Sequence, residues 1–80
     1  MTFKVVVSPG AGRLRLLPPQ RFEDGAEWVE EGQPVARIEQ GRGGEVVLRA
    51  PVGGRVAAVL GLEGEPVAAG HPVMAIDPRT

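Results

Sequence analysis

The chain has 80 residues, a length that fits one compact domain and is too short for two. Its net charge of −1 excludes the basic face that nucleic-acid binding requires, and its apolar runs are far shorter than the roughly 20 residues that cross a bilayer. No segment has the pattern of a secretory signal. These features predict one cytoplasmic domain over residues 1–80 that binds neither nucleic acid nor membrane.

The composition favours short strands joined by turns. The chain contains 12 Gly and 8 Pro, a quarter of all residues, and they are distributed through its length. Both residue types interrupt regular structure and occupy tight turns. The absence of cysteine excludes disulfides, thiolate metal sites and a cysteine nucleophile.

Strand patterns occur along the whole chain. Leu14 and Leu16 alternate with arginines, which gives one buried and one solvated face at a period of two residues. No stretch has a 3.6-residue period long enough to predict a helix. We therefore expect an all-β chain with strands near residues 3–7, 13–17, 35–39, 45–50, 55–60 and 73–77.

Two sequence patterns occur twice. The pattern Pro-x-x-Gly-Arg-apolar at residues 9–14 recurs at 51–56, displaced by 42 positions. The pattern Val-x-x-Gly-x-Pro-Val at residues 29–35 recurs at 67–73, displaced by 38 positions. The chain is therefore predicted to contain two half-repeats.

The half-repeats extend over about residues 3–39 and 45–77. Their unequal offsets place about four extra residues in the first half, which we interpret as a loop insertion at residues 18–21. The repeat aligns Ile38 with Ile76, and alternation directs both side chains inward. We expect these two isoleucines to occupy equivalent core sites.

The order of these motifs resembles that of the biotinyl/lipoyl carrier domains. The resemblance rests on residues 27–35, 49–56 and 65–73, which contain Val-x-x-Gly, then Ala-Pro with Gly-x-apolar, then a second Val-x-x-Gly. It covers nearly the whole chain. The resemblance implies a barrel-sandwich hybrid, a flattened β-barrel of two small sheets with pseudo-twofold symmetry.

Carriers of this family are acylated with biotin or lipoate on a lysine at the tip of the hairpin between the two halves. The corresponding residues 39–45 contain no lysine. Counting forward from Gly32 places Arg42 at the modified position, whereas counting back from residues 50–51 places Gly43 there. The Arg42 guanidinium has a pKa above about 12 and stays protonated, so it cannot form the amide.

Lys4 is the only lysine, and it belongs to the first predicted strand, away from the expected tip. We therefore predict that the chain carries no cofactor. The resemblance leaves two readings of the tip: a recognition loop whose arginine binds a carboxylate or phosphate, or a solvated glycine-rich turn. The candidate interaction tip consists of Gly41, Arg42, Gly43 and Gly44.

Three other features of the sequence are typical of functional sites but also have structural explanations. His71 is the only histidine, and its repeat counterpart is Gln33, which favours an exposed turn position over a base or metal ligand. Trp28 either covers the edge of the small core or marks a partner surface. The acidic residues between Glu23 and Glu31 are interpreted as a solvated loop.

No catalytic residue or metal-ligand set can be assigned from these patterns. We expect a non-catalytic, unmodified biotinyl/lipoyl-like domain that acts through protein contacts with an unidentified partner, either as a stand-alone accessory protein or as a degenerate relative of a carboxyl or acyl carrier. Two alternatives remain open at this point. One is a biotin or lipoyl carrier subunit of a carboxylase or dehydrogenase complex, modified at an unconventional place, and the other is the lipoyl-like domain of an efflux adaptor.

Overall fold

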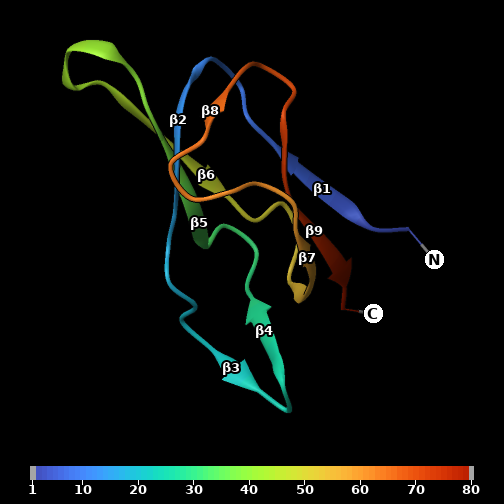
Figure 1. Cartoon of the computed structure of the whole chain (residues 1–80). Helices are drawn as coiled ribbons and strands as arrows, with labels where there is room; N and C mark the ends of the chain where they lie inside the picture. The colour runs from blue at the N-terminus through green and yellow to red at the C-terminus, as the bar shows by residue number, and fades with distance from the viewer. Residues whose placement is uncertain (1, 80) are drawn as a thin grey trace.

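The computed structural model describes residues 2–79 and has an all-β fold of two antiparallel sheets, as the sequence predicted (Figure 1). The five-stranded sheet has the order β1 (Lys4–Val7), β9 (Pro72–Pro78), β7 (Gly54–Val59), β4 (Ala26–Val29) and β3 (Phe22–Glu23). The four-stranded sheet has the order β6 (Glu45–Arg49), β5 (Pro34–Glu39), β2 (Gly12–Leu16) and β8 (Pro66–Val67). The architecture is a flattened barrel-sandwich whose two sheets do not close into a barrel.

The six predicted strands are present with ends displaced by at most one residue, but three short strands were missed. Two of them, β3 and β4, form a hairpin with the two-residue turn Asp24-Gly25, whose φ angles are 53° and 74°. Positive φ at both central residues is the geometry of the tight hairpin turn that Asp-Gly favours. The prediction of a solvated loop over this acidic region was therefore wrong. The third, β8, has two residues and no alternation to detect.

The core lies between the two sheets. Ile38 and Ile76 are completely buried, which confirms their predicted inward orientation. Both belong to one cluster that draws on β1, β2, β4, β5, β6, β8 and β9. The other members of this cluster are Val6, Leu14, Val29, Val35, Ala36, Leu48, Ala50, Val67, Val73 and Met74.

A tight turn around Gly32 joins β4 to β5. Gly32 has a φ of 85°, a left-handed conformation that glycine adopts without steric cost. Its amide donates a hydrogen bond to the carbonyl of Ala50 (2.8 Å), and the amide of Ala50 donates to the carbonyl of Gln33 (2.9 Å). The turn is thereby tied to the chain directly after β6.

A second turn, around Gly70, joins β8 to β9 and has the same φ of 85°. Its amide donates to the carbonyl of Ser8 (2.7 Å), and the amide of Ser8 donates to the carbonyl of His71 (2.9 Å). This turn is tied to the chain directly after β1. Gly32 and Gly70 are 38 positions apart, whereas their hydrogen-bond partners Ser8 and Ala50 are 42 positions apart. These are the offsets of the two sequence patterns.

Two glycines permit close approach of crossing backbones. A Cβ atom at Gly12 would overlap the carbonyl of Glu39, and a Cβ at Gly54 would overlap the carbonyl of Asp77. Both glycines begin a strand, β2 or β7, and both lie against the end of the strand that pairs with it, β5 or β9. A larger residue at either place would push the paired strands apart.

Candidate functional site

The β5–β6 hairpin extends beyond the body of the sandwich, and its tip contains the predicted interaction residues (Figure 1). The two strands pair as far as Glu39 and Glu45. The amide of Gln40 then donates to the carbonyl of Gly44 (2.8 Å), which closes the loop. Five residues, 40–44, therefore form the tip.

Arg42 is the central residue of this loop. It lies in a short 3₁₀ turn, Gly41–Gly43, and has left-handed backbone angles (φ 63°, ψ 35°). Residues 41–44 are all exposed, and the Arg42 guanidinium makes no hydrogen bond or ion pair with any residue between 2 and 79. The tip thus presents a solvated fork of N–H donors, which matches a carboxylate or phosphate group.

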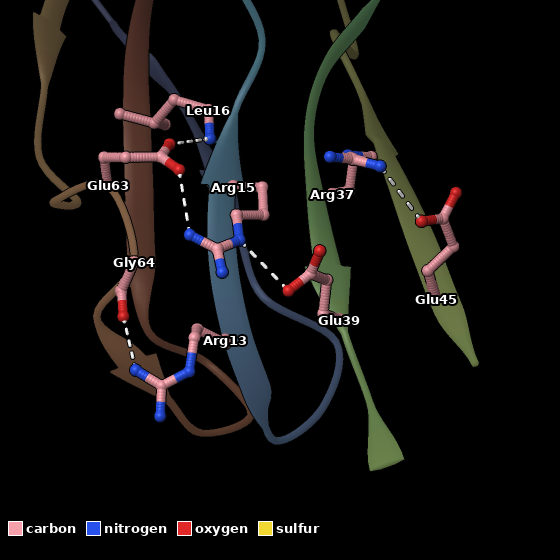
Figure 2. A network of polar contacts seen from close by, with 8 residues as sticks. All are labelled: Arg13, Arg15, Leu16, Arg37, Glu39, Glu45, Glu63 and Gly64. Atoms are coloured by element: carbon pink, nitrogen blue, oxygen red, sulfur yellow. Dashed lines mark hydrogen bonds and ion pairs between the residues drawn. The ribbon is translucent and has the colours of Figure 1, made fainter. Parts of the chain in front are cut away.

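Ion pairs fix the base of the hairpin (Figure 2). Glu39 and Glu45 lie directly opposite each other, and like charges in this arrangement repel. The Arg15 Nε lies 3.0 Å from a Glu39 carboxylate oxygen, and an Arg37 guanidinium nitrogen lies 3.3 Å from Glu45. Each carboxylate therefore has its own arginine on the solvent face of the four-stranded sheet.

Glu63 extends this network to the segment that precedes β8 (Figure 2). Its carboxylate accepts from the backbone amide of Leu16 (2.7 Å) and from the Arg15 guanidinium (3.2 Å). The hydrogen bond from the Leu16 amide and the nearby Arg15 guanidinium lower the pKa of the Glu63 carboxyl below its ordinary value. Arg13 donates to the carbonyl of Gly64 (2.7 Å) in the same segment. Ion pairs and hydrogen bonds connect the base of the hairpin to neighbouring segments, whereas the side chain at its tip has no such contact among residues 2–79.

Trp28 lies on β4, close to the Asp24-Gly25 turn. Its indole Nε1 donates to the carbonyl of Glu23 (3.1 Å), and the Arg21 guanidinium lies 5.9 Å from the ring centroid. A carboxylate oxygen of Glu23 in turn lies 2.7 Å from Arg21. These contacts give Trp28 a structural role in the β3–β4 hairpin, at the end of the molecule opposite the glycine-rich tip (Figure 1).

His71 lies in the turn after Gly70 and is partly exposed. Its Nε2 is 3.2 Å from a carboxylate oxygen of Glu65, which also accepts from the amide of Leu62 (2.8 Å). Among residues 2–79, no three His, Cys, Asp or Glu side chains gather as a metal site would require. The histidine is therefore one half of a surface pair.

Lys4 lies at the start of β1. Figure 1 shows β1 on the side of the molecule opposite the hairpin tip. The sequence prediction had placed this amine in the first strand, and the structure agrees. The tip and the lysine are not brought together.

A groove that the sequence patterns did not predict lies between β1 and β6. It has a volume of about 320 Å³ and is lined by residues 5–7, 9, 46–49 and 51. Val6 and Leu48 form its buried floor, while Val5, Val7 and Val47 remain 40–49% exposed. The missed signal was the run of consecutive valines in both strands, which places an apolar side chain on the outer face as well as the inner one.

No helix among residues 2–79 is long and apolar enough to span a membrane. Comparison of the sequence with protein-family models and with curated proteins gave no match.

Proposed function

We propose that this chain is a non-catalytic, unmodified biotinyl/lipoyl-like domain that acts through protein contacts and is related to the carboxyl and acyl carriers. The observation that carries the proposal is the hairpin tip, where Arg42 is central in a five-residue loop that projects from the body. In the family that the sequence resembles, this place belongs to the modified lysine. A cytoplasmic location is part of the same proposal.

The matched turns support the internal repeat on which the resemblance depends. Gly32 and Gly70 share the same φ and equivalent hydrogen bonds, and Gly12 and Gly54 make equivalent close approaches. Two halves with the same backbone interactions, packed on one core, are the arrangement that a pseudo-twofold repeat predicts. The two antiparallel sheets are compatible with this arrangement.

Chemistry at the tip supports contact rather than covalent carriage. Amide formation needs a neutral amine, whereas a guanidinium remains protonated and poorly nucleophilic at physiological pH. What Arg42 offers is paired N–H donors, and charge-assisted hydrogen bonds to a carboxylate suit that geometry. The tip is therefore proposed to bind an acidic group of a protein partner without being modified.

The test is the intact mass of the chain after expression with an active biotin ligase and, separately, with an active lipoate ligase, each with its cofactor supplied. We expect the unmodified mass in both cases. Stoichiometric addition of one biotinyl or lipoyl group would overturn the proposal and restore the carrier alternative. Peptide mapping would then identify the modified amine.

A further inference from the structure

The open side of the sandwich is formed by two edge strands. β1 pairs only with β9, and β6 pairs only with β5, so each strand has one side without a neighbour among residues 2–79. An edge strand presents a row of backbone N–H and C=O groups that another strand can pair with. Here two such rows flank one groove.

The two free edges border one groove. Residues of both β1 and β6 line it, so an extended segment seated there would lie beside the unpaired backbone groups of both strands. Such a segment would bridge the β1–β6 seam, the opening between residues 4–7 and 45–49 at which the two sheets do not close into a barrel.

The groove also indicates the side chains of its occupant. Its floor is Val6 and Leu48, and its rim includes the exposed Val5 and Val47, so apolar side chains on the face of an inserted strand that is turned into the groove would be desolvated. Among residues 2–79, Arg49 is the only charged residue that lines the groove.

The charge at this seam is positive. Lys4 and Arg49 form no ion pair within residues 2–79, and the Arg49 guanidinium donates only to the carbonyl of Gly32 (3.0 Å). The one carboxylate on these two strands, Glu45, is already paired with Arg37. An acidic side chain on the occupant would therefore find two available cations.

From these observations we propose that the β1–β6 seam binds an extended segment of a protein partner in which apolar and acidic residues alternate, and that the segment pairs with both edge strands. This inference rests on the proposed function, since it specifies the protein contact. Main-chain hydrogen bonds would supply part of the affinity, and the valines and the two cations would select the side chains.

The probe is a blocked heptapeptide that alternates valine with glutamate, long enough to span four- and five-residue strands. Binding to the full chain is followed by NMR titration and by amide hydrogen exchange. We expect saturable binding with slower exchange of the amides of β1 and β6. A peptide with lysine in place of glutamate, and one with alternate backbone nitrogens methylated, should each bind at least about tenfold more weakly because they lose the charge or the pairing.

Matched variants locate the site. Val47→Glu should reduce affinity for the glutamate peptide at least about tenfold, since it adds a like charge to the rim of the groove. Val59→Glu is the control: Val59 is 50% exposed, comparable to the 40% of Val47, but lies outside the groove. Arg49→Gln should weaken binding of the glutamate peptide and reduce its dependence on salt, while not weakening the binding of the lysine peptide, which has no carboxylate for Arg49 to contact.

Several outcomes would overturn the proposal. The first is equal affinity for all three peptides, and the second is an equal loss of affinity for the glutamate peptide in Val47→Glu and Val59→Glu. The third is a dimer of the chain alone in which the amides of β1 and β6 are protected from exchange and the peptide is excluded. The last result would assign the seam to a second copy. None of these outcomes alters the mass after ligase treatment, so failure of this inference is distinguishable from failure of the proposed function.

Discussion

The turn around Gly32 and the turn around Gly70 have equivalent backbone hydrogen bonds but different side-chain contacts. Gln33 accepts from the amide of Glu30 (3.0 Å) through its side-chain oxygen, whereas His71 instead contacts the Glu65 carboxylate. The shared features are a left-handed glycine and a pair of backbone hydrogen bonds to a residue directly after another strand, Ala50 after β6 or Ser8 after β1. Backbone geometry therefore determines the turn, and the partly exposed side chain between Gly and Pro differs between the two turns.

The regions that differ most are the two hairpins at the ends of the molecule. The β3–β4 hairpin turns through two residues and is held by Trp28 and Arg21. The β5–β6 hairpin turns through five residues, and ion pairs connect its base to β2, whereas the Arg42 side chain makes no hydrogen bond or ion pair with any residue from 2 to 79. A short turn with an aromatic contact stabilises structure, while an uncontacted glycine-rich loop leaves its side chain available to a partner.

The largest expected effect tests whether the two halves contribute equally to the core. Ile38→Ala and Ile76→Ala should each lower the free energy of unfolding by about 2 to 5 kcal/mol, because each removes a completely buried side chain and leaves a cavity. Chemical denaturation of each variant measures this. A loss below about 0.5 kcal/mol for either would contradict the equivalence of the two sites.

The next effect concerns the paired close approaches. Gly12→Ala and Gly54→Ala should each destabilise the chain by about 1 to 3 kcal/mol, since the added Cβ would overlap a backbone carbonyl. Gly41→Ala is the matched control, because nothing lies within 4 Å of the position its Cβ would take. Equal stability of all three variants in denaturant would show that strand crossing does not require glycine.

A smaller, pH-dependent effect is expected at Glu63, which links β2 to the segment before β8. Because the folded-state pKa of its carboxyl is lowered, Glu63 contributes stability above its ordinary pKa of 4.5, and this contribution is lost as pH falls through the folded value. Glu63→Gln should therefore be less stable than the parent chain near pH 7, with the difference shrinking in acid.

Glu31→Gln serves as the comparison for this prediction, because the Glu31 carboxylate has no hydrogen-bond or ion-pair partner among residues 2–79. Thermal unfolding from pH 3 to pH 7 measures both variants. If Glu63→Gln and Glu31→Gln had the same thermal stability at every pH, Glu63 would not contribute to holding the base of the hairpin.

The smallest effect is expected at the tip. Arg42→Gly should raise stability by no more than about 0.5 kcal/mol, because relief of the left-handed backbone of Arg42 is offset by the greater flexibility of glycine in the unfolded chain. Amide relaxation should also show residues 41–44 as the most mobile internal segment. Backbone order parameters for residues 41–44 as high as those of β5 and β6 would contradict an adaptable recognition loop.

Sequence patterns predicted the long strands because alternation of apolar and polar residues reports which face is buried. They predicted Ile38 and Ile76 as core residues for the same reason. They failed at β3 and β4, where Phe22 is 65% exposed and the strands are too short to show a period, although Asp24-Gly25 was a usable turn signal.

The hairpin tip was predictable from its glycines and its position between two strands. The groove was not, because it depends on β1 and β6 lying at the edges of opposite sheets, and strand order is a property of the tertiary structure. The ion pairs at the hairpin base were also missed. Arg15 and Glu63 are 48 positions apart, and only the pairing of β2 with its neighbours brings them together.

The central claim is that this hairpin has the form of a carrier tip without the carrier's amine. It is tested most directly by supplying the amine in the residue context that each ligase expects: the triple variant Gly41→Met, Arg42→Lys, Gly43→Met for a biotin ligase, and Gly41→Asp, Arg42→Lys for a lipoate ligase. Intact mass is compared with that of the parent chain under the same conditions. The account predicts one added group on at least one variant, at the residue-42 lysine, and none on the parent; modification of the parent chain, or no modification of either variant, would contradict it.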